Sequence, residues 1–149
     1  MMTATLIAQY HRDLDRLSRE IIAYNREEDL WATEKGINNS AGNLCLHIVG
    51  NLQHFIGNVL GKSGYVRNRE AEFNDRGISR EVLLKQINLT RQSIETTLQA
   101  LTPQQLDALY PVEVFGEPMT TTYFLIHLLG HLNYHLGQVN YHRRLVARA

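Results

Sequence analysis

The chain has 149 residues, of which 44% are hydrophobic and 20% are charged, and its 15 basic and 15 acidic side chains leave no net charge. This length and composition exclude a disordered chain and predict one soluble domain over residues 1–149. The lack of a basic excess argues against nucleic acid as a partner, and the lack of a long apolar run argues against a membrane partner. The N-terminal residues show no secretory signal pattern, so we expect a cytoplasmic protein.

Four long helical segments are predicted along the chain. Residues 3–26 carry apolar side chains at spacings of three and four, which is typical of an amphipathic helix. Residues 27–39 are expected to form a connection. Ser40 is a candidate N-cap for a helix over 41–62, which ends close to two glycines. The following stretch, 63–78, is polar and has no period, so we expect a long loop there.

The second half of the chain begins with another capped helix. Ser79 is the expected N-cap of a helix that continues to residue 101, and Thr102 with Pro103 begins a short helix to about residue 109. Residues 110–119 are expected to form an extended loop or a small hairpin. Thr120 or Thr121 then begins the last helix, which continues to residue 146. These segments predict an all-α fold, an antiparallel four-helix bundle with long connecting loops.

Histidines are unusually frequent, and four of the seven lie in the last predicted helix. His131 and His135 are one helical turn apart, a spacing at which two imidazoles can bind one metal ion. His127 and His131 share this spacing and form the alternative pair. On a helical wheel the 131/135 pair lies closer to the apolar stripe, which favours it, and Gln138 lies on the same arc.

The predicted helix over 41–62 carries a matching polar stripe, His47, Asn51, His54 and Asn58, beside its apolar face. Buried polar groups need partners, and a metal ion held between two facing helices would provide one. His47 and His54 are two turns apart, so we expect only one of them to be a primary ligand. For any single histidine, a hydrogen-bonded core residue is the competing interpretation.

Other reactive side chains have simpler expectations. His11 and His142 are expected at the surface or at helix ends, and Cys45 is expected to be a small buried residue rather than a nucleophile. Arg67 and Arg69 lie in the predicted loop, where they could bind the carboxylates of a thiol cofactor or an acidic substrate. Ion pairs between these arginines and the acidic residues of the same loop are the more frequent alternative.

Two segments carry a family resemblance. The run HLLGHLNYHLGQVNYHRR, with its core H-x-x-x-H-x-G-Q, resembles the C-terminal helix motif of the DinB-like (YfiT-like) superfamily of metal-dependent proteins. The segments NLCLHIVGNLQHFI and RNREAEF resemble one branch of that superfamily. The resemblance implies a four-helix bundle, often a homodimer, that holds a divalent metal through His47, His131 and His135. His54, His127, Asn51 and Gln138 would then be alternative ligands or groups that position the ligands.

The resemblance also implies a chemistry. Active members of the superfamily resemble thiol S-transferases that use bacillithiol, mycothiol or a related small thiol. Three imidazole ligands suit zinc, nickel or iron and leave positions open on the metal, where a thiol could bind as its thiolate. We therefore expect a metal-dependent transferase that joins a small thiol to an electrophile. The alternatives are a non-catalytic, stress-related, dimerising metal-binding module and a metal-dependent hydrolase.

Overall fold

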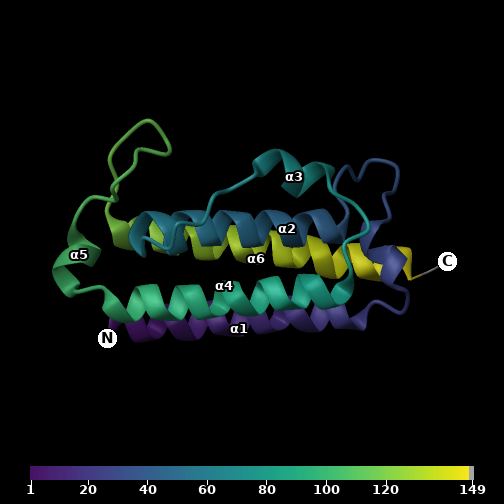
Figure 1. The fold of residues 1–149 in the computed structure, drawn as a ribbon, viewed down its shortest axis with the longest axis horizontal. Helices are drawn as coiled ribbons and strands as arrows, with labels where there is room; N and C mark the ends of the chain where they lie inside the picture. The colour runs from purple at the N-terminus through teal and green to yellow at the C-terminus, as the bar shows by residue number, and fades with distance from the viewer. Residues whose placement is uncertain (148–149) are drawn as a thin grey trace.

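The computed structural model describes residues 1–147, and its architecture is a bundle of four long helices (Figure 1). Two short helices and a 3-10 helix, Glu27–Trp31, lie in the connections. Within the described residues the only β-type pairings are two isolated bridges, so the predicted all-α fold is confirmed. The long helices are α1 (Met2–Ala23), α2 (Ala41–Leu52), α4 (Arg80–Ala100) and α6 (Thr121–Val146), and the short ones are α3 (Arg69–Asn74) and α5 (Pro103–Asp107).

The directions of the helices explain the longest connection. α1 and α6 run one way along the bundle, whereas α2 and α4 both run the other way (Figure 1). Because α2 and α4 are parallel, the chain must return along the bundle between them, as in bundles with a crossover connection. Residues 61–79 make this crossover. The loop expected over 63–78 is therefore corrected: it contains α3, whose N-cap Asn68 accepts a hydrogen bond from the Ala71 amide.

Side-chain caps fix most of the helix starts where the sequence places them. Ser40, Ser79 and Thr120 each accept a hydrogen bond from the amide three residues later. Thr102 forms a complete capping box with Gln105. The first helix, by contrast, ends at Ala23 rather than near residue 26, because Tyr24 turns to an extended backbone and directs its side chain into the core.

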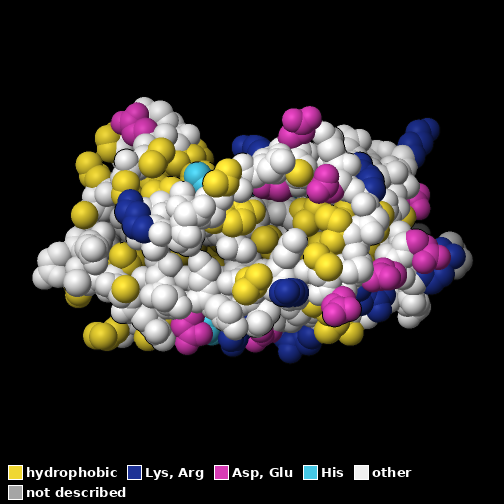
Figure 2. Space-filling model, in the orientation of Figure 1, with side chains coloured by type: hydrophobic (Ala, Val, Ile, Leu, Met, Phe, Trp, Pro, Cys, Tyr) yellow, Lys and Arg dark blue, Asp and Glu magenta, His cyan; other side chains and the backbone are white. Residues whose placement is uncertain are grey.

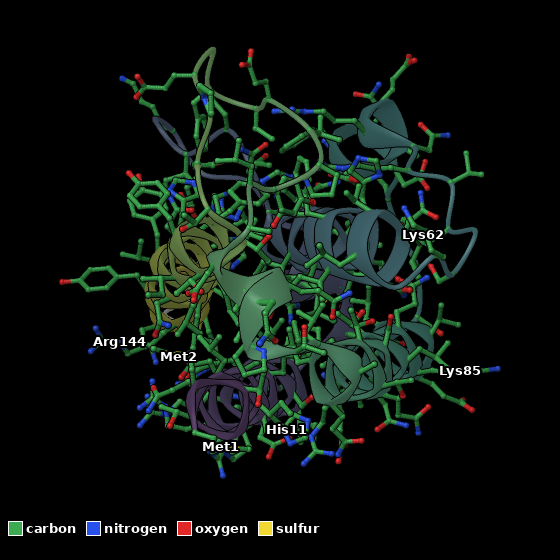
Figure 3. All side chains as sticks on the ribbon, turned by 90° about the vertical axis from the view of Figure 1, so that its left-hand side faces the viewer. Met1, Met2, His11, Lys62, Lys85 and Arg144 are labelled. Atoms are coloured by element: carbon green, nitrogen blue, oxygen red, sulfur yellow. The ribbon has the colours of Figure 1, made fainter. Side chains whose placement is uncertain are left out.

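The second helix differs from an ordinary amphipathic helix in two ways. Every residue from Ala41 to Leu52 is buried, because α3, α4, α6 and the 3-10 helix all pack against it. Beyond Leu52 the chain continues as a π-helical segment, Gln53–Leu60. The wider turns of a π-helix change the direction of the side chains that follow, so the polar stripe predicted from Asn51 to Asn58 is not one continuous row. Seen end-on, α3 and the α5–α6 loop lie outside α2 and α6 (Figure 3).

His142 lies near the C-terminal end of α6 but is buried, which corrects the expectation of a surface position. The Tyr24 hydroxyl donates a hydrogen bond to Nδ1 of His142 at 2.6 Å, and Nε2–H of His142 donates to the Ala32 carbonyl at 2.8 Å. The residue therefore fastens the segment after α1 to α6. His11 is half-buried, with Nε2 3.5 Å from Glu95. Cys45 is fully buried as predicted, and burial raises its pKa to about 12.

The core extends over all four long helices, and one of its hydrogen bonds joins α1 to α6. The Tyr10 hydroxyl donates to the Leu125 carbonyl at 2.6 Å, and its ring is completely buried. Within residues 1–147, no helix combines the length and the apolar character that crossing a bilayer requires.

Replacement of Tyr10 by Phe should therefore lower the free energy of unfolding by about 1 kcal/mol, because a buried hydrogen bond is lost while the ring packing stays. Urea denaturation followed by circular dichroism measures this change. Tyr123→Phe is the matched control, because that side chain is largely exposed. Equal stability of the two variants would contradict the assignment.

Candidate metal centre

Three histidines from two helices meet at one point of the bundle. His47 lies on α2, and His131 and His135 lie one turn apart on α6. The Nε2 atom of His131 is 3.2 Å from Nε2 of His47 and 3.1 Å from Nε2 of His135. One nitrogen from each ring lies within 4.8 Å of the other two, so the three residues could hold a metal ion. α2 and α6 are antiparallel neighbours, which brings these distant segments together.

Neighbouring acceptors fix which nitrogen of two rings carries the proton. The Glu72 carboxylate can only accept, so Nδ1–H of His47 donates to it, at 3.0 Å. Nδ1–H of His135 likewise donates to the side-chain oxygen of Gln138 at 2.7 Å. The Nε2 atoms of both rings are therefore left with a free lone pair. These second contacts orient the rings, as they do around the histidine ligands of known metal sites.

The donor set fits a divalent transition metal. Nitrogens 3.1–3.2 Å apart need a proton or a cation between their lone pairs, and a metal ion would satisfy all three rings at once. Zinc–imidazole bonds of about 2.0–2.1 Å in a tetrahedral site place two nitrogens about 3.3–3.4 Å apart, close to the distances found here. Neutral imidazole suits zinc, nickel or iron and not magnesium or calcium. The three histidines could therefore hold a metal ion, as the sequence predicts.

Burial and mutual proximity keep the rings on α6 neutral. Burial, followed by the fields of His135, His47 and His127, lowers the pKa of His131 to about 4. Burial also lowers the pKa of His135 below its ordinary value, although its hydrogen bond to Gln138 acts in the opposite direction. The neutral form is the one that binds metals.

Glu72 contacts the three-histidine cluster, although the sequence did not mark it as a ligand or as a group that positions one. Its carboxylate is buried, and Arg67 binds it through two hydrogen bonds, from Nε to Oε2 at 2.8 Å and from Nη2 to Oε1 at 2.9 Å. Burial raises the pKa of the Glu72 carboxyl, but the hydrogen bonds from His47 and Arg67 outweigh it and hold the pKa below its ordinary value. An acidic residue of a predicted polar loop gave no sequence signal, because only the crossover brings it to His47.

Two further residues shape the contact between Glu72 and His47. A Cβ atom at Gly50 would overlap the Glu72 carboxylate, so glycine at this position gives the Glu72 side chain room to lie against α2. The Phe73 ring packs against the His47 ring, with a centroid distance of 4.9 Å. Arg67 is thus engaged in an ion pair of the crossover, and Arg69 is exposed at the start of α3. A role for either arginine in binding a substrate stays a prediction.

The other candidate ligands lie outside the three-histidine cluster. His127 is exposed one turn before His131, and its ring contacts Phe115 at a centroid distance of 4.7 Å. His54 lies in the π-helical segment, where its ring packs on Phe55. Asn51 is buried one turn beyond His47, and among the described residues its Oδ1 finds no hydrogen-bond partner.

Comparisons with known proteins agree with this fold. Residues 4–149 match the family described as "Protein of unknown function (DUF1572)". The crystal structure of a DinB-like protein from Bacillus cereus is similar, with a TM-score of 0.75 and 19% sequence identity over 95% of this chain and 91% of that chain. No curated protein sequence gives a significant match. The chain therefore belongs to the DUF1572 family and has the helical-bundle fold of a DinB-like protein.

Proposed function

We propose that the protein binds one divalent transition-metal ion through His47, His131 and His135 and acts as a metal-dependent thiol S-transferase. The observation that carries the metal site is the convergence of three histidine Nε2 atoms, two of them on rings whose opposite nitrogens are held by Glu72 and Gln138.

Three protein ligands are typical of catalytic rather than structural sites, since a fourth position stays open. The bound ion would supply positive charge that favours the thiolate of a small thiol. In the proposed reaction the thiol sulfur forms a bond to an electrophilic carbon, the leaving group departs with its bonding electrons, and the thiol proton passes to solvent. The chain's own part is to hold the rings in one orientation and one protonation state, through Glu72 and Gln138.

Replacement of His131 by Ala should abolish stoichiometric metal binding, because this residue lies between the other two ligands. His127→Ala is the matched control: the same residue type, on the same helix, one turn away and outside the cluster. Elemental analysis of protein made without a histidine tag should find about one zinc, nickel or iron per chain in the wild type and in the control. Stoichiometric binding that survives His131→Ala in a folded protein would contradict the site.

Replacement of Glu72 by Gln should weaken zinc or cobalt binding by about 10- to 100-fold, because residues that orient a ligand contribute to metal affinity by that amount. Gly50→Ala should act in the same direction by displacing the carboxylate. Competition titration against a chromophoric chelator gives the affinities. The controls are Arg69→Gln, on the exposed part of α3, and Gly130→Ala, where a Cβ meets no neighbour. If Glu72→Gln and Arg69→Gln bind the metal with equal affinity, Glu72 does not position His47 for metal binding.

Addition of a small thiol such as bacillithiol to the cobalt-substituted protein should produce a sulfur-to-metal charge-transfer band. Conjugation of that thiol to a generic electrophile should require metal and should be lost in His135→Ala, with helicity retained by circular dichroism. Absorption spectroscopy and product analysis measure the two effects. If several thiols leave the cobalt spectrum unchanged, the protein is instead a non-catalytic metal-binding module.

A further inference from the structure

We propose that the cavity beneath the α5–α6 loop binds the neutral, apolar body of the substrate, and that Asn51 accepts a hydrogen bond from its polar head at the metal centre. The inference rests on the proposed metal site and adds the direction of approach and the class of substrate. Apolar pockets with a few convergent polar groups are the usual form of small-molecule sites.

The arrangement of α2 and α6 decides which side of the centre is open. Because these helices are antiparallel, Asn51 and His127 each lie one turn from a ligand, toward the same end of the bundle. The α5–α6 loop lies at that end (Figure 1). Because these two side chains and the loop all lie on one side of the three histidines, we infer that the ligand enters between Asn51 and His127.

Two other cavities lie behind the ligands and not in front of them. A cavity of about 580 Å³ between α2, α3 and α4 has Glu72 in its wall. A cavity of about 330 Å³ near the start of α2 has Gln138 in its wall. Glu72 and Gln138 contact their histidines through Nδ1, on the opposite side of the ring from the converging Nε2 atoms. The walls of these two cavities thus contain the Nδ1 partners of the ligands, whereas the cavity beneath the loop contains His127, one turn from the ligand His131.

The cavity beneath the loop has a volume of about 500 Å³ and includes His127 in its wall. The loop is pinned at its base, where the Tyr110 amide donates to the Met119 carbonyl at 2.8 Å and the Tyr110 hydroxyl donates to the Phe55 carbonyl at 2.6 Å. Hydrophobic side chains gather on this loop, at the upper left of Figure 2. The base of the loop is thus fixed to the π-helical segment that follows the helix carrying Asn51.

The lining of this cavity selects a class of molecule. Phe115, Met119 and Tyr123 provide aromatic and thioether surface, and Phe115 is half exposed although its ring already touches His127. Among the described lining residues the only formal charge is that of Glu117, a carboxylate, so an anionic body would be repelled. An aromatic or branched aliphatic group that is neutral or cationic fits this surface.

Asn51 supplies the polar contact. The residue is only 7% exposed, and its Oδ1 has no hydrogen-bond partner within residues 1–147. A buried carbonyl oxygen without a hydrogen bond is costly, so a bound molecule with an N–H or O–H donor gains from this position. Asn51 would orient the head of the substrate beside the metal while the body lies under the loop.

Hydroxamates test both contacts, because they bind transition metals and carry an N–H donor. We expect the cobalt-loaded protein to bind benzohydroxamate about 10-fold more tightly than acetohydroxamate, since only the former has an apolar body for the cavity. Titration followed by cobalt absorption gives both affinities. Phe115→Ala should bring their ratio close to one. Val112→Ala, an exposed residue of the same loop outside the cavity lining, should leave the ratio unchanged.

Asn51→Leu should weaken acetohydroxamate more than N-methylacetohydroxamate, which has no N–H to donate. Failure of the protein to bind cobalt through the three histidines would refute the proposed function itself. If cobalt binds but the phenyl group gives no advantage, or Phe115→Ala leaves the advantage intact, the cavity is not the substrate site. Equal losses for the two acetohydroxamates in Asn51→Leu would overturn the role of Asn51.

Discussion

The hydrogen bond from His47 to Glu72 is the contact on which the rest of the site depends, because it joins the helix that carries a ligand to the segment that crosses over that helix. A parallel α2–α4 pair forces the chain to return along the bundle, and this return brings α3 over α2. Without the crossover, His47 would face solvent on its Nδ1 side and either nitrogen could carry the proton. With it, Nε2 alone is free to bind a cation.

Burial makes the charge of Glu72 and the proton position of His47 depend on each other. Glu72 and His47 are both buried, and the guanidinium of Arg67 supplies the charge that keeps the carboxylate ionised in a place where water is scarce. The carboxylate in turn accepts a hydrogen bond from Nδ1–H of His47 and so holds the ring proton on that nitrogen. Two residues that are 20 and 25 positions from His47 in the sequence, Arg67 and Glu72, thus determine how its Nε2 atom is presented.

Local signals in the sequence were sufficient for the four long helices, although not for α3, since caps such as Ser40 and Ser79 act within four residues. The i, i+4 spacing of His131 and His135 likewise depends on one helix only. Glu72 could not be found in this way, because its partner is 25 positions away and only the crossover brings them together. The burial of His142 depends on a similar long-range contact with Tyr24. Helical periodicity also gives no warning of the π-helical segment, which takes His54 out of line with His47.

Two glycines in α2 lower its intrinsic helix stability but permit close contacts with neighbouring segments. Glycine in a helix interior costs about 0.5–1 kcal/mol relative to alanine. A Cβ at Gly42 would collide with Trp31, and one at Gly50 would collide with Glu72. Alanine therefore cannot recover the lost helix stability at either position without displacing a neighbour. These close approaches let α2 be covered on every side while its polar face still meets α6. The glycines of α2 are thus required by the segments that pack on it. Gly50 also leaves room for the Glu72 carboxylate, which orients the His47 ring.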